Sequence, residues 1–305
     1  MAELGEANIG GRMVPAWLLN LTAEELDSLK SRWYSNPNLL DNGYFVNPVN
    51  QRGQTSYPGA GYGIDRWKSG NSNLTVNLTG EGIVLISGSA ASYLSQYFDP
   101  GIPSEGSYTI SALVEAVAGT AYFQAIYADG TYGPAMKLTT GLNALAVKAT
   151  KTISRVLFQV NAGASVTVKA TKLELGSQQT LAHQDADGNW VLNEIPDYGE
   201  QLARCQRYFI KLTNVILNGM TNSGGTLAFG AIPLPVSMRA KPSVSSYIFS
   251  YCVAGGTKIT SVSSAAVYGG NSDQSMFYVQ FGVSGLPGDT NFAAYMNDIA
   301  LTADL

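Results

Sequence analysis

Few side chains in this sequence are equipped to act as a nucleophile or to move a proton. Nucleophilic catalysis by serine or cysteine normally needs a neighbouring base, most often histidine, and His183 is the only histidine among the 305 residues. The two cysteines, Cys205 and Cys252, together with one histidine, cannot furnish a structural zinc site. We therefore predict no catalytic residue, no metal site and no cofactor.

Glycoside hydrolysis is the one reaction that the composition leaves open, because it needs only two carboxylates about 5–10 Å apart. The first half of the chain offers five candidates, namely Asp65, Glu81, Asp99, Glu105 and Glu115. Nothing in their spacing singles out two of them. We expect a protein that is not an enzyme, and a polysaccharide depolymerase with a carboxylate pair in this region stays as an alternative.

Tyrosines and amides beside turns are the residues best suited to bind a ligand. The sequence contains 17 tyrosines, each of which combines a flat apolar face with a hydroxyl, and Asn, Asp and Ser side chains can hydrogen-bond to sugar hydroxyls. Such residues gather in two predicted loops near the C-terminus. We predict a glycan-binding surface formed by Tyr268, Asn271, Asp273, Asp289 and Asn291.

Composition argues against two classes of partner. The net charge of −4 and a pI near 5.1 give no basic surface for nucleic acid, and no stretch approaches the length of about 18 apolar residues that a membrane-spanning helix needs. The acidic N-terminal segment MAELGEANIGG has no apolar core and is not typical of a signal peptide. We expect folding in a bacterial cytoplasm, with both cysteines as thiols.

The chain between residues 38 and 176 has the pattern of an all-β domain. Apolar residues such as Tyr108 and Ile110 alternate with polar ones, as they do on half-buried strands. Val166, Val168 and Ala170 share one face of the last strand, whereas Leu173 and Leu175 have the other parity. This change of parity predicts a β-bulge near Thr171 and Lys172 that returns both sets to the core. Evenly spaced short strands without helices between them predict an antiparallel jelly-roll sandwich, with strands at 74–78, 83–87, 92–98, 107–114, 120–127, 135–139, 144–150, 152–161 and 165–175.

Two predicted helices lie outside the strand-rich regions. Thr22 and Glu25 form a capping box that begins a helix in the leader, residues 1–36. A short helix with one apolar stripe cannot fold alone, so it must dock on this chain, a sister chain or another protein. A second capping box, Asp197 with Glu200, begins a helix in the connector, residues 177–209. One face of this second helix is apolar and carries Leu202, Cys205 and Phe209.

The connector also contains Asp187-Gly188, which predicts a hairpin turn. Beyond it the chain is again β, with predicted strands in FIKLTNVIL, TLAFGAIPL, SVSSYIFSY, KITSVSSAAVY, SMFYVQFGV and DIALTADL. The predicted architecture is therefore all-β, with an N-terminal jelly-roll β-sandwich, a short connector helix and a C-terminal β-sandwich tip domain. Its segments are a leader at 1–36, the jelly roll at 37–176, the connector at 177–209 and the tip domain at 210–305.

Several segments resemble the tail-fibre and receptor-binding proteins of tailed bacteriophages and prophages. NLLDNGYFVNPVNQRG (38–53) with YGIDRW (62–67) resembles the opening of a fibre jelly roll, and ATKLELGS (170–177) its closing strand. The segment YGEQLARCQRYF (198–209) resembles the helix that introduces the terminal domain of such fibres. PLPVSMRAKPSV (233–244) resembles an inner strand of that domain, and NDIALTADL (297–305) resembles its last strand.

The resemblance implies a homotrimer in the virion tail that binds a host cell-surface polysaccharide. It implies attachment of the N-terminus to the phage tail or baseplate, directly or through an adaptor, and it carries over no catalytic or binding residue. In such a trimer the stripe Leu202, Cys205 and Phe209 is the candidate for packing near the three-fold axis. A single-chain bacterial carbohydrate-binding module stays as a second alternative.

Overall fold

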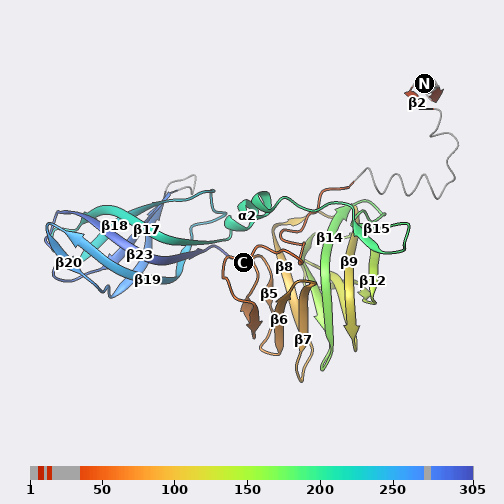
Figure 1. Cartoon of the computed structure of the whole chain (residues 1–305), viewed down its shortest axis with the longest axis horizontal. Helices are drawn as coiled ribbons and strands as arrows, with labels where there is room; N and C mark the ends of the chain where they lie inside the picture. The colour runs from red at the N-terminus through yellow and green to blue at the C-terminus, as the bar shows by residue number, and fades with distance from the viewer. Residues whose placement is uncertain (1–5, 10–11, 16–34, 271–275, 305) are drawn as a thin grey trace. The chain divides into compact units, whose positions relative to one another are not determined.

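The structure is a computed structural model that describes residues 6–9, 12–15, 35–270 and 276–304. The leader helix predicted after Thr22 lies outside the described residues. Two compact units are present (Figure 1). The first comprises the described part of Met1–Val46 together with Asn77–Tyr93 and Phe98–Ile195, and the second comprises the described residues of Asn47–Val76, Leu94–Tyr97 and Pro196–Leu305.

Strands dominate both units, and the all-β prediction is confirmed. In the described part of the chain the one helix is α2 (Tyr198–Gln206), and no described helix is long and apolar enough to cross a bilayer. The side chain of Asp197 caps α2 by accepting a hydrogen bond from the Glu200 amide at 2.9 Å, as the capping box predicts. Near the N-terminus, β1 (Glu6–Ile9) and β2 (Arg12–Pro15) pair as an antiparallel hairpin.

Two six-stranded sheets form the jelly-roll sandwich. The first has the order β11-β10-β13-β8-β5-β4, and the second has the order β12-β9-β14-β7-β6-β3. Each predicted jelly-roll strand overlaps a strand of the structure. The strands are β3 (Ser56–Pro58), β4 (Gly61–Tyr62), β5 (Lys68–Ser69), β6 (Leu74–Thr79), β7 (Gly82–Ser87), β8 (Ser92–Ile102), β9 (Ser107–Ala118), β10 (Ala121–Tyr127), β11 (Tyr132–Lys137), β12 (Gly141–Lys148), β13 (Ile153–Val160) and β14 (Ser165–Leu175).

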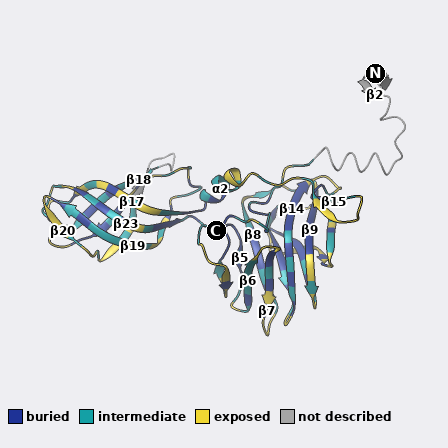
Figure 2. Ribbon diagram, viewed as in Figure 1, coloured by how far each residue is buried: buried dark blue, intermediate teal, exposed yellow. Residues whose placement is uncertain are grey.

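The core of the first unit contains the aromatic side chains that alternation turns inward. Phe123 of β10 stacks on Phe158 of β13 with ring centroids 4.3 Å apart, and Phe45 meets Phe158 edge-on at 6.4 Å. All three rings are buried, and Figure 2 shows buried residues along the strands of this unit. Because Phe123 and Phe158 point into the sandwich, their neighbours on β10 and β13 must point away from it.

The predicted β-bulge exists, but it lies a few residues before its predicted position. The register of β14 against β9 shifts between Thr167 and Ala170, not at Thr171 and Lys172. The shift keeps Val168 buried and also buries Leu173, as predicted. Leu175 was expected on the core side with Leu173, and it is instead 56% exposed.

A hairpin of β15 (Ala182–Gln184) and β16 (Trp190–Leu192) follows the sandwich. Its turn contains Gly188 with φ of 81°, which confirms the Asp187-Gly188 turn prediction. The hairpin buries a small apolar cluster against the outer side of the second sheet, formed by Leu113, Ala170, Leu181 and Ala182, with Tyr44, Leu142 and Leu192 packed on it.

The C-terminal part of the second unit is one seven-stranded sheet with the order β20-β19-β23-β17-β18-β22-β21. One face of the sheet encloses the core, which includes Leu217, Phe277 and Ile299. The strands are β17 (Phe209–Thr221), β18 (Leu227–Pro233), β19 (Ser243–Ala254), β20 (Thr257–Ile259), β21 (Ser264–Gly270), β22 (Met276–Gly282) and β23 (Asn291–Thr302).

Candidate functional site

Most of the segments that carry the resemblance meet in the second unit around the guanidinium of Arg52, whereas ATKLELGS (170–177) lies in the first unit. Its two terminal nitrogens contact the carboxylates of Asp65 at 3.2 Å and Asp304 at 2.7 Å. The guanidinium also lies 3.8 Å from the ring centroid of Phe209, which gives a close cation–π contact. Gln51 adds a backbone hydrogen bond to Asp65 at 2.7 Å and a side-chain bond to the Phe209 carbonyl, also at 2.7 Å.

A second guanidinium extends this cluster. Arg66 is buried and lies 3.4 Å from the ring centroid of Tyr208, while its Nη2 donates to the Tyr97 carbonyl at 2.8 Å. Arg239 donates to the Ala303 carbonyl at 3.0 Å. The segments NQRG, YGIDRW, QRYF, MRAKP and TADL are far apart in the sequence, yet all of them contribute to this one set of contacts.

The Arg52 cluster is a structural centre rather than a ligand site, because its charged groups contact one another. Burial raises the pKa of Asp65 to about 6, against the opposing effects of the Gln51 backbone hydrogen bond and the Arg52 charge. Burial also raises the pKa of Asp304. Both carboxylates face a cation and are nearly inaccessible, so the cluster holds segment 47–76 on the C-terminal sheet.

The structure places the predicted glycan-binding residues at opposite ends of the seven-stranded sheet. Tyr268 lies on β21, whose far end pairs with the start of β22. Asp289 and Asn291 lie beyond the other end of β22, where the Asp289 amide donates to the Asn222 carbonyl at 3.2 Å. The seven residues of β22 separate these ends by about 20 Å.

Within the described residues Tyr268 is thus apart from Asp289 and Asn291, and glycan binding by each loop stays a prediction. Asp289 and Asn291 are both exposed. Asn271 and Asp273 lie outside the described residues, and the same is true of the side chain of Tyr268.

The predicted trimer-interface residues are mostly buried within a single chain. Cys205 is fully buried, as expected for a small core residue, and Phe209 is 4% exposed beneath Arg52. Leu202 is half-buried. Their role at a three-fold axis stays a prediction, and of the three only Leu202 offers appreciable surface.

Three of the five carboxylates considered for glycoside hydrolysis are engaged in other contacts, and the remaining two, Asp99 and Glu105, are exposed. Asp65 belongs to the Arg52 cluster. Glu81 and Glu115 lie 3.3 Å and 2.6 Å from the ammonium of Lys169, whose pKa rises mainly through its hydrogen bond with Glu115. That ammonium lies between the two carboxylates, where a scissile glycosidic oxygen would have to lie.

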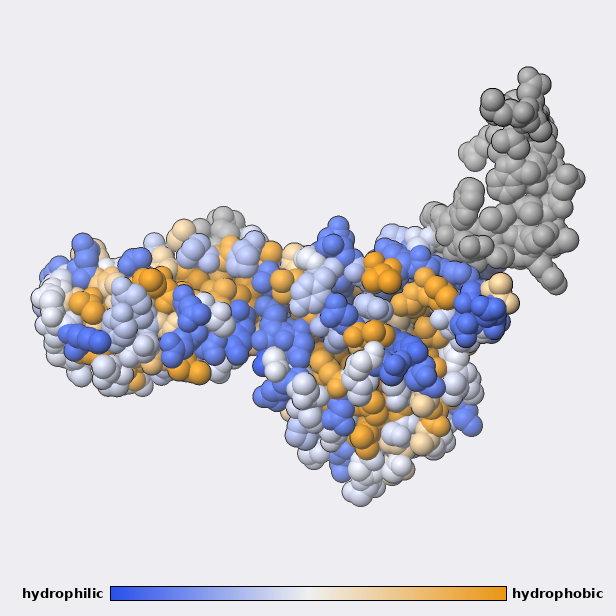
Figure 3. Space-filling view, in the orientation of Figure 1, coloured by the Kyte–Doolittle hydropathy of each residue, from blue (hydrophilic) through white to orange (hydrophobic). Residues whose placement is uncertain are grey.

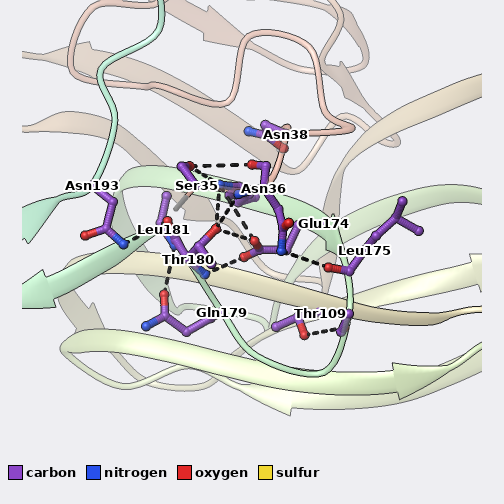
Figure 4. Close-up of polar contacts among 12 residues, drawn as sticks. Ser35, Asn36, Asn38, Thr109, Glu174, Leu175, Gln179, Thr180, Leu181 and Asn193 are labelled. Carbon is purple, nitrogen blue, oxygen red and sulfur yellow. Dashed lines mark hydrogen bonds and ion pairs between the residues drawn. The ribbon is translucent and has the colours of Figure 1, made fainter. Parts of the chain in front are cut away.

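A buried ion pair that the sequence did not reveal joins Lys172 and Glu174 of β14. Figure 4 shows the polar contacts around Glu174. Lys172 and Glu174 are 3% and 0% exposed, and their charged atoms are 3.7 Å apart. The Lys172 ammonium donates to the hydroxyls of Ser35 at 2.7 Å and Thr180 at 2.9 Å. Thr180 in turn donates its amide and its hydroxyl to Glu174.

This arrangement is structural as well. Burial lowers the pKa of Lys172, and the charge of Glu174 opposes that effect. The ammonium donates to two hydroxyls and has the Glu174 carboxylate 3.7 Å away, so the geometry suits a charged lysine rather than a neutral amine that would activate Ser35 as a nucleophile.

The first unit presents a different kind of surface on the outside of its first sheet. Opposite residues of antiparallel strands share a face, and here they form three rows across β11, β10 and β13. We call this surface the Tyr122 face. Its rows are Lys137–Tyr122–Gln159, Ala135–Gln124–Leu157 and Tyr132–Ile126–Arg155.

The middle row of the Tyr122 face is recessed although it points away from the core. Gln124 is 4% exposed and Leu157 is 1% exposed, whereas the flanking Tyr122 and Gln159 are partly accessible. The amide of Gln159 donates to the Asn161 side chain at 3.0 Å, and Gln124 lies 3.5 Å from Gln159. The face thus combines an aromatic ring with a short chain of amides.

One end of the Tyr122 face is fixed by the turn between β10 and β11. Asp129 accepts hydrogen bonds from the Thr131 amide at 3.0 Å and from Lys151, and these interactions, led by that with Lys151, hold the pKa of Asp129 well below its usual range. Directly after the turn, Tyr132 is 58% exposed. Tyr122 and Ile126 are four residues apart on β10, so the rows of Tyr122 and Tyr132 are about 13 Å apart.

The Tyr122 face was missed because its residues read as ordinary outward positions of two strands. One signal was available in the sequence. Gln124 and Gln159 each place an amide among aromatic and aliphatic residues, in AYFQAIY and ISRVLFQV. An amide at such a position must find a partner, and its two donors and one acceptor can serve a ligand.

Comparisons with known proteins give distant structural similarity only. No protein-family model matches the sequence, and no curated protein matches it. A mutant of a family 29 carbohydrate-binding module is 11% identical, with a TM-score of 0.30, over 43% of this chain and 94% of that chain. A tandem family 22 module of Xyn10C from Paenibacillus barcinonensis is 12% identical, with a TM-score of 0.31, over 88% of this chain and 98% of that chain.

The enzymatically active domain of tailspike protein 4 of bacteriophage CBA120 is 13% identical, with a TM-score of 0.29, over 46% of this chain and 21% of that chain. At such scores the comparisons assign no function. The chemistry of the described surfaces has to carry any functional conclusion.

Proposed function

We propose that this chain is a non-catalytic receptor-binding protein of a bacteriophage tail fibre. In this proposal it works as a homotrimer in the virion, joins the tail or an adaptor through its N-terminus, and attaches the particle to host cells by binding a cell-surface glycan. The ligand lies on the Tyr122 face of the jelly roll.

The observation that carries the glycan-binding part is the amide and aromatic composition of that face. Sugars offer hydroxyls that both donate and accept, and apolar C–H patches that stack on rings. Gln159 supplies a partly accessible amide that can do both, with the recessed Gln124 amide 3.5 Å behind it, and Tyr122 supplies a partly accessible ring beside it. The two outer rows are about 13 Å apart along the strands, which suits a short oligosaccharide rather than a single sugar.

The virion part rests on the sequence segments that resemble phage fibres. Their convergence around Arg52 supports reading them as parts of one structural unit rather than as unrelated matches.

A glycan array of bacterial surface polysaccharides and peptidoglycan fragments tests the ligand. We expect binding by the natural chain and a loss of about 10- to 100-fold for Tyr122→Ala combined with Gln159→Ala, since each lost contact is worth roughly 1 kcal/mol or more. Lys148→Ala, an exposed position on β12 of the other sheet, is the matched control and should bind normally. Equal binding by the double variant would exclude this face.

The alternatives are separated by two further measurements. Antibodies against the chain should decorate the tails of particles released from the producing bacterium, and labelling of bacterial cells alone would favour a bacterial carbohydrate-binding module. A depolymerase would release reducing ends from a bound polysaccharide and lose that activity in Glu81→Gln or Glu115→Gln. We expect no release by the natural chain.

A further inference from the structure

The seven-stranded sheet of the second unit has apolar residues on both of its faces. Along β17, Leu217 is fully buried in the core, whereas the alternate residues Ile216 and Met220 point outward and are each 53% exposed. Tyr278 on β22 is 46% exposed. An antiparallel sheet with one solvated face normally places polar residues there, so these side chains indicate a covered surface.

Strand register shows that these residues belong to one continuous surface. Ile216 lies opposite Tyr295, and Tyr295 lies opposite Tyr251 and stacks on it with ring centroids 4.3 Å apart. Met220 lies opposite Phe229. We call the outward side of β19, β23, β17, β18 and β22 the Ile216 face. Apolar residues interrupt the polar surface over this sheet in the space-filling view (Figure 3).

Large and small side chains are sorted into rows on the Ile216 face. One row contains Tyr251, Tyr295 and Ile216, and another contains Met220 and Phe229. Between them runs a row with the smaller residues Val253, Ala293, Asn218 and Ala231 before it reaches Tyr278. A surface with protruding rows beside a low row can interdigitate with a copy of itself.

The charge on the face favours the same occupant. Over β19, β23, β17, β18 and β22 these rows hold no acidic or basic side chain, and the polar residues that continue the Met220 row, Asn291 and Gln280, are neutral. Lys258 of edge strand β20 lies opposite Val253 and 4.2 Å from the ring centroid of Tyr251, so it places a cation at the edge of the face. Away from that edge a charged partner would find no counter-charge and would lose its own hydration. A second copy presents the same neutral, apolar rows.

We infer that the Ile216 face is the surface through which copies of this chain associate. The inference names the surface for the self-association in the proposed function, and it does not depend on glycan binding at the Tyr122 face. It replaces the stripe Leu202, Cys205 and Phe209, of which Cys205 and Phe209 are committed to the core of one chain.

Sedimentation velocity of the full chain at micromolar concentration tests the surface. The natural chain should sediment as a multiple of its 32.3 kDa mass. Ile216→Asp and, separately, Met220→Asp should weaken association by about 100-fold or more, because each would bury an unpaired carboxylate. Ile195→Asp, at an apolar residue that is 69% exposed in the first unit, is the matched control and should leave the oligomer intact.

Three results would overturn the inference. They are a monomeric natural chain, unchanged sedimentation of both face variants, or dissociation by Leu202→Asp while Ile216→Asp remains assembled. Near-ultraviolet circular dichroism shows whether each variant is folded. If Ile216→Asp is not folded, the sedimentation of Met220→Asp tests the surface instead. Glycan-array binding is measured in parallel. Failure of the natural chain to bind glycans would then be distinguished from failure of its copies to associate.

Discussion

Replacing Arg52 by methionine tests whether the Arg52 cluster holds the second unit together. Methionine keeps much of the apolar stem against Phe209 but removes the charge between Asp65 and Asp304. The side chains of these carboxylates are only 1% and 9% exposed, so they would be left buried without their shared cation. Removing one partner of a buried ion pair costs about 3–5 kcal/mol of unfolding free energy, and we expect a loss of that size at pH 7.5.

The loss should depend on pH in a defined direction. The pKa of Asp65 is raised to about 6 in the folded chain from an ordinary value of 3.8. Between those pH values Asp65 binds more protons in the folded state than in the unfolded state. Its contribution to the free energy of unfolding therefore becomes more favourable as pH falls through 6 toward 4. Without Arg52 the repulsion between Asp65 and Asp304 raises their pKa values further. The cost of Arg52→Met should therefore shrink by roughly 1–3 kcal/mol between pH 7.5 and 5.5.

Urea unfolding followed by tryptophan fluorescence provides the assay, because Trp67 is fully buried in the second unit. Lys151→Met is the control. It removes the partner of Asp129 in an exposed ion pair of the first unit, and it should leave the Trp67 transition unchanged. A cost for Arg52→Met below 1 kcal/mol, or one that is equal at both pH values, would refute the reasoning.

Two further variants test the first unit. Gly82 has φ of 126°, and a Cβ there would lie 2.2 Å from the Val168 carbonyl oxygen. Gly82→Ala should therefore lower the free energy of thermal unfolding by about 2–4 kcal/mol. Gly80 has open space around it, so Gly80→Ala is the control and should be nearly neutral. Lys172→Met should cost about 3–5 kcal/mol because it leaves a buried carboxylate unpaired, and adding Glu174→Gln should recover part of that loss in a double-mutant cycle. Equal melting of both glycine variants, or strictly additive losses at the ion pair, would contradict these expectations.

Strand positions could be predicted closely because turns and alternation are local signals. The Asp187-Gly188 turn and the Asp197 cap appear where the sequence places them. The bulge in β14 shows the limit of such signals. Parity between Val168 and Leu173 requires one extra residue between them but does not fix its position. Contacts from other strands, such as those of Lys169 with Glu81 and Glu115, become known only with the register.

Binding surfaces were harder to predict, because composition was the only guide to them. A loop rich in tyrosine and amide residues, such as that of Tyr268, is the most visible pattern in the sequence. On a strand, an outward Gln124 looks like any solvated residue. Its recessed position depends on neighbours from β11 and β13, and these are brought beside it by pairings that the sequence does not encode locally.

The residues of the Arg52 cluster and the residues proposed to touch a ligand are different sets in different units. Arg52 and Asp65 are buried, pair with each other and organise the second unit, so their identity is fixed by packing and charge. Tyr122 and Gln159 are partly accessible and make few contacts that the sheet needs. Ligand preference can therefore change through substitutions on the Tyr122 face without disturbing the Arg52 cluster. For this reason the motifs of this sequence predict the scaffold but do not specify the proposed ligand.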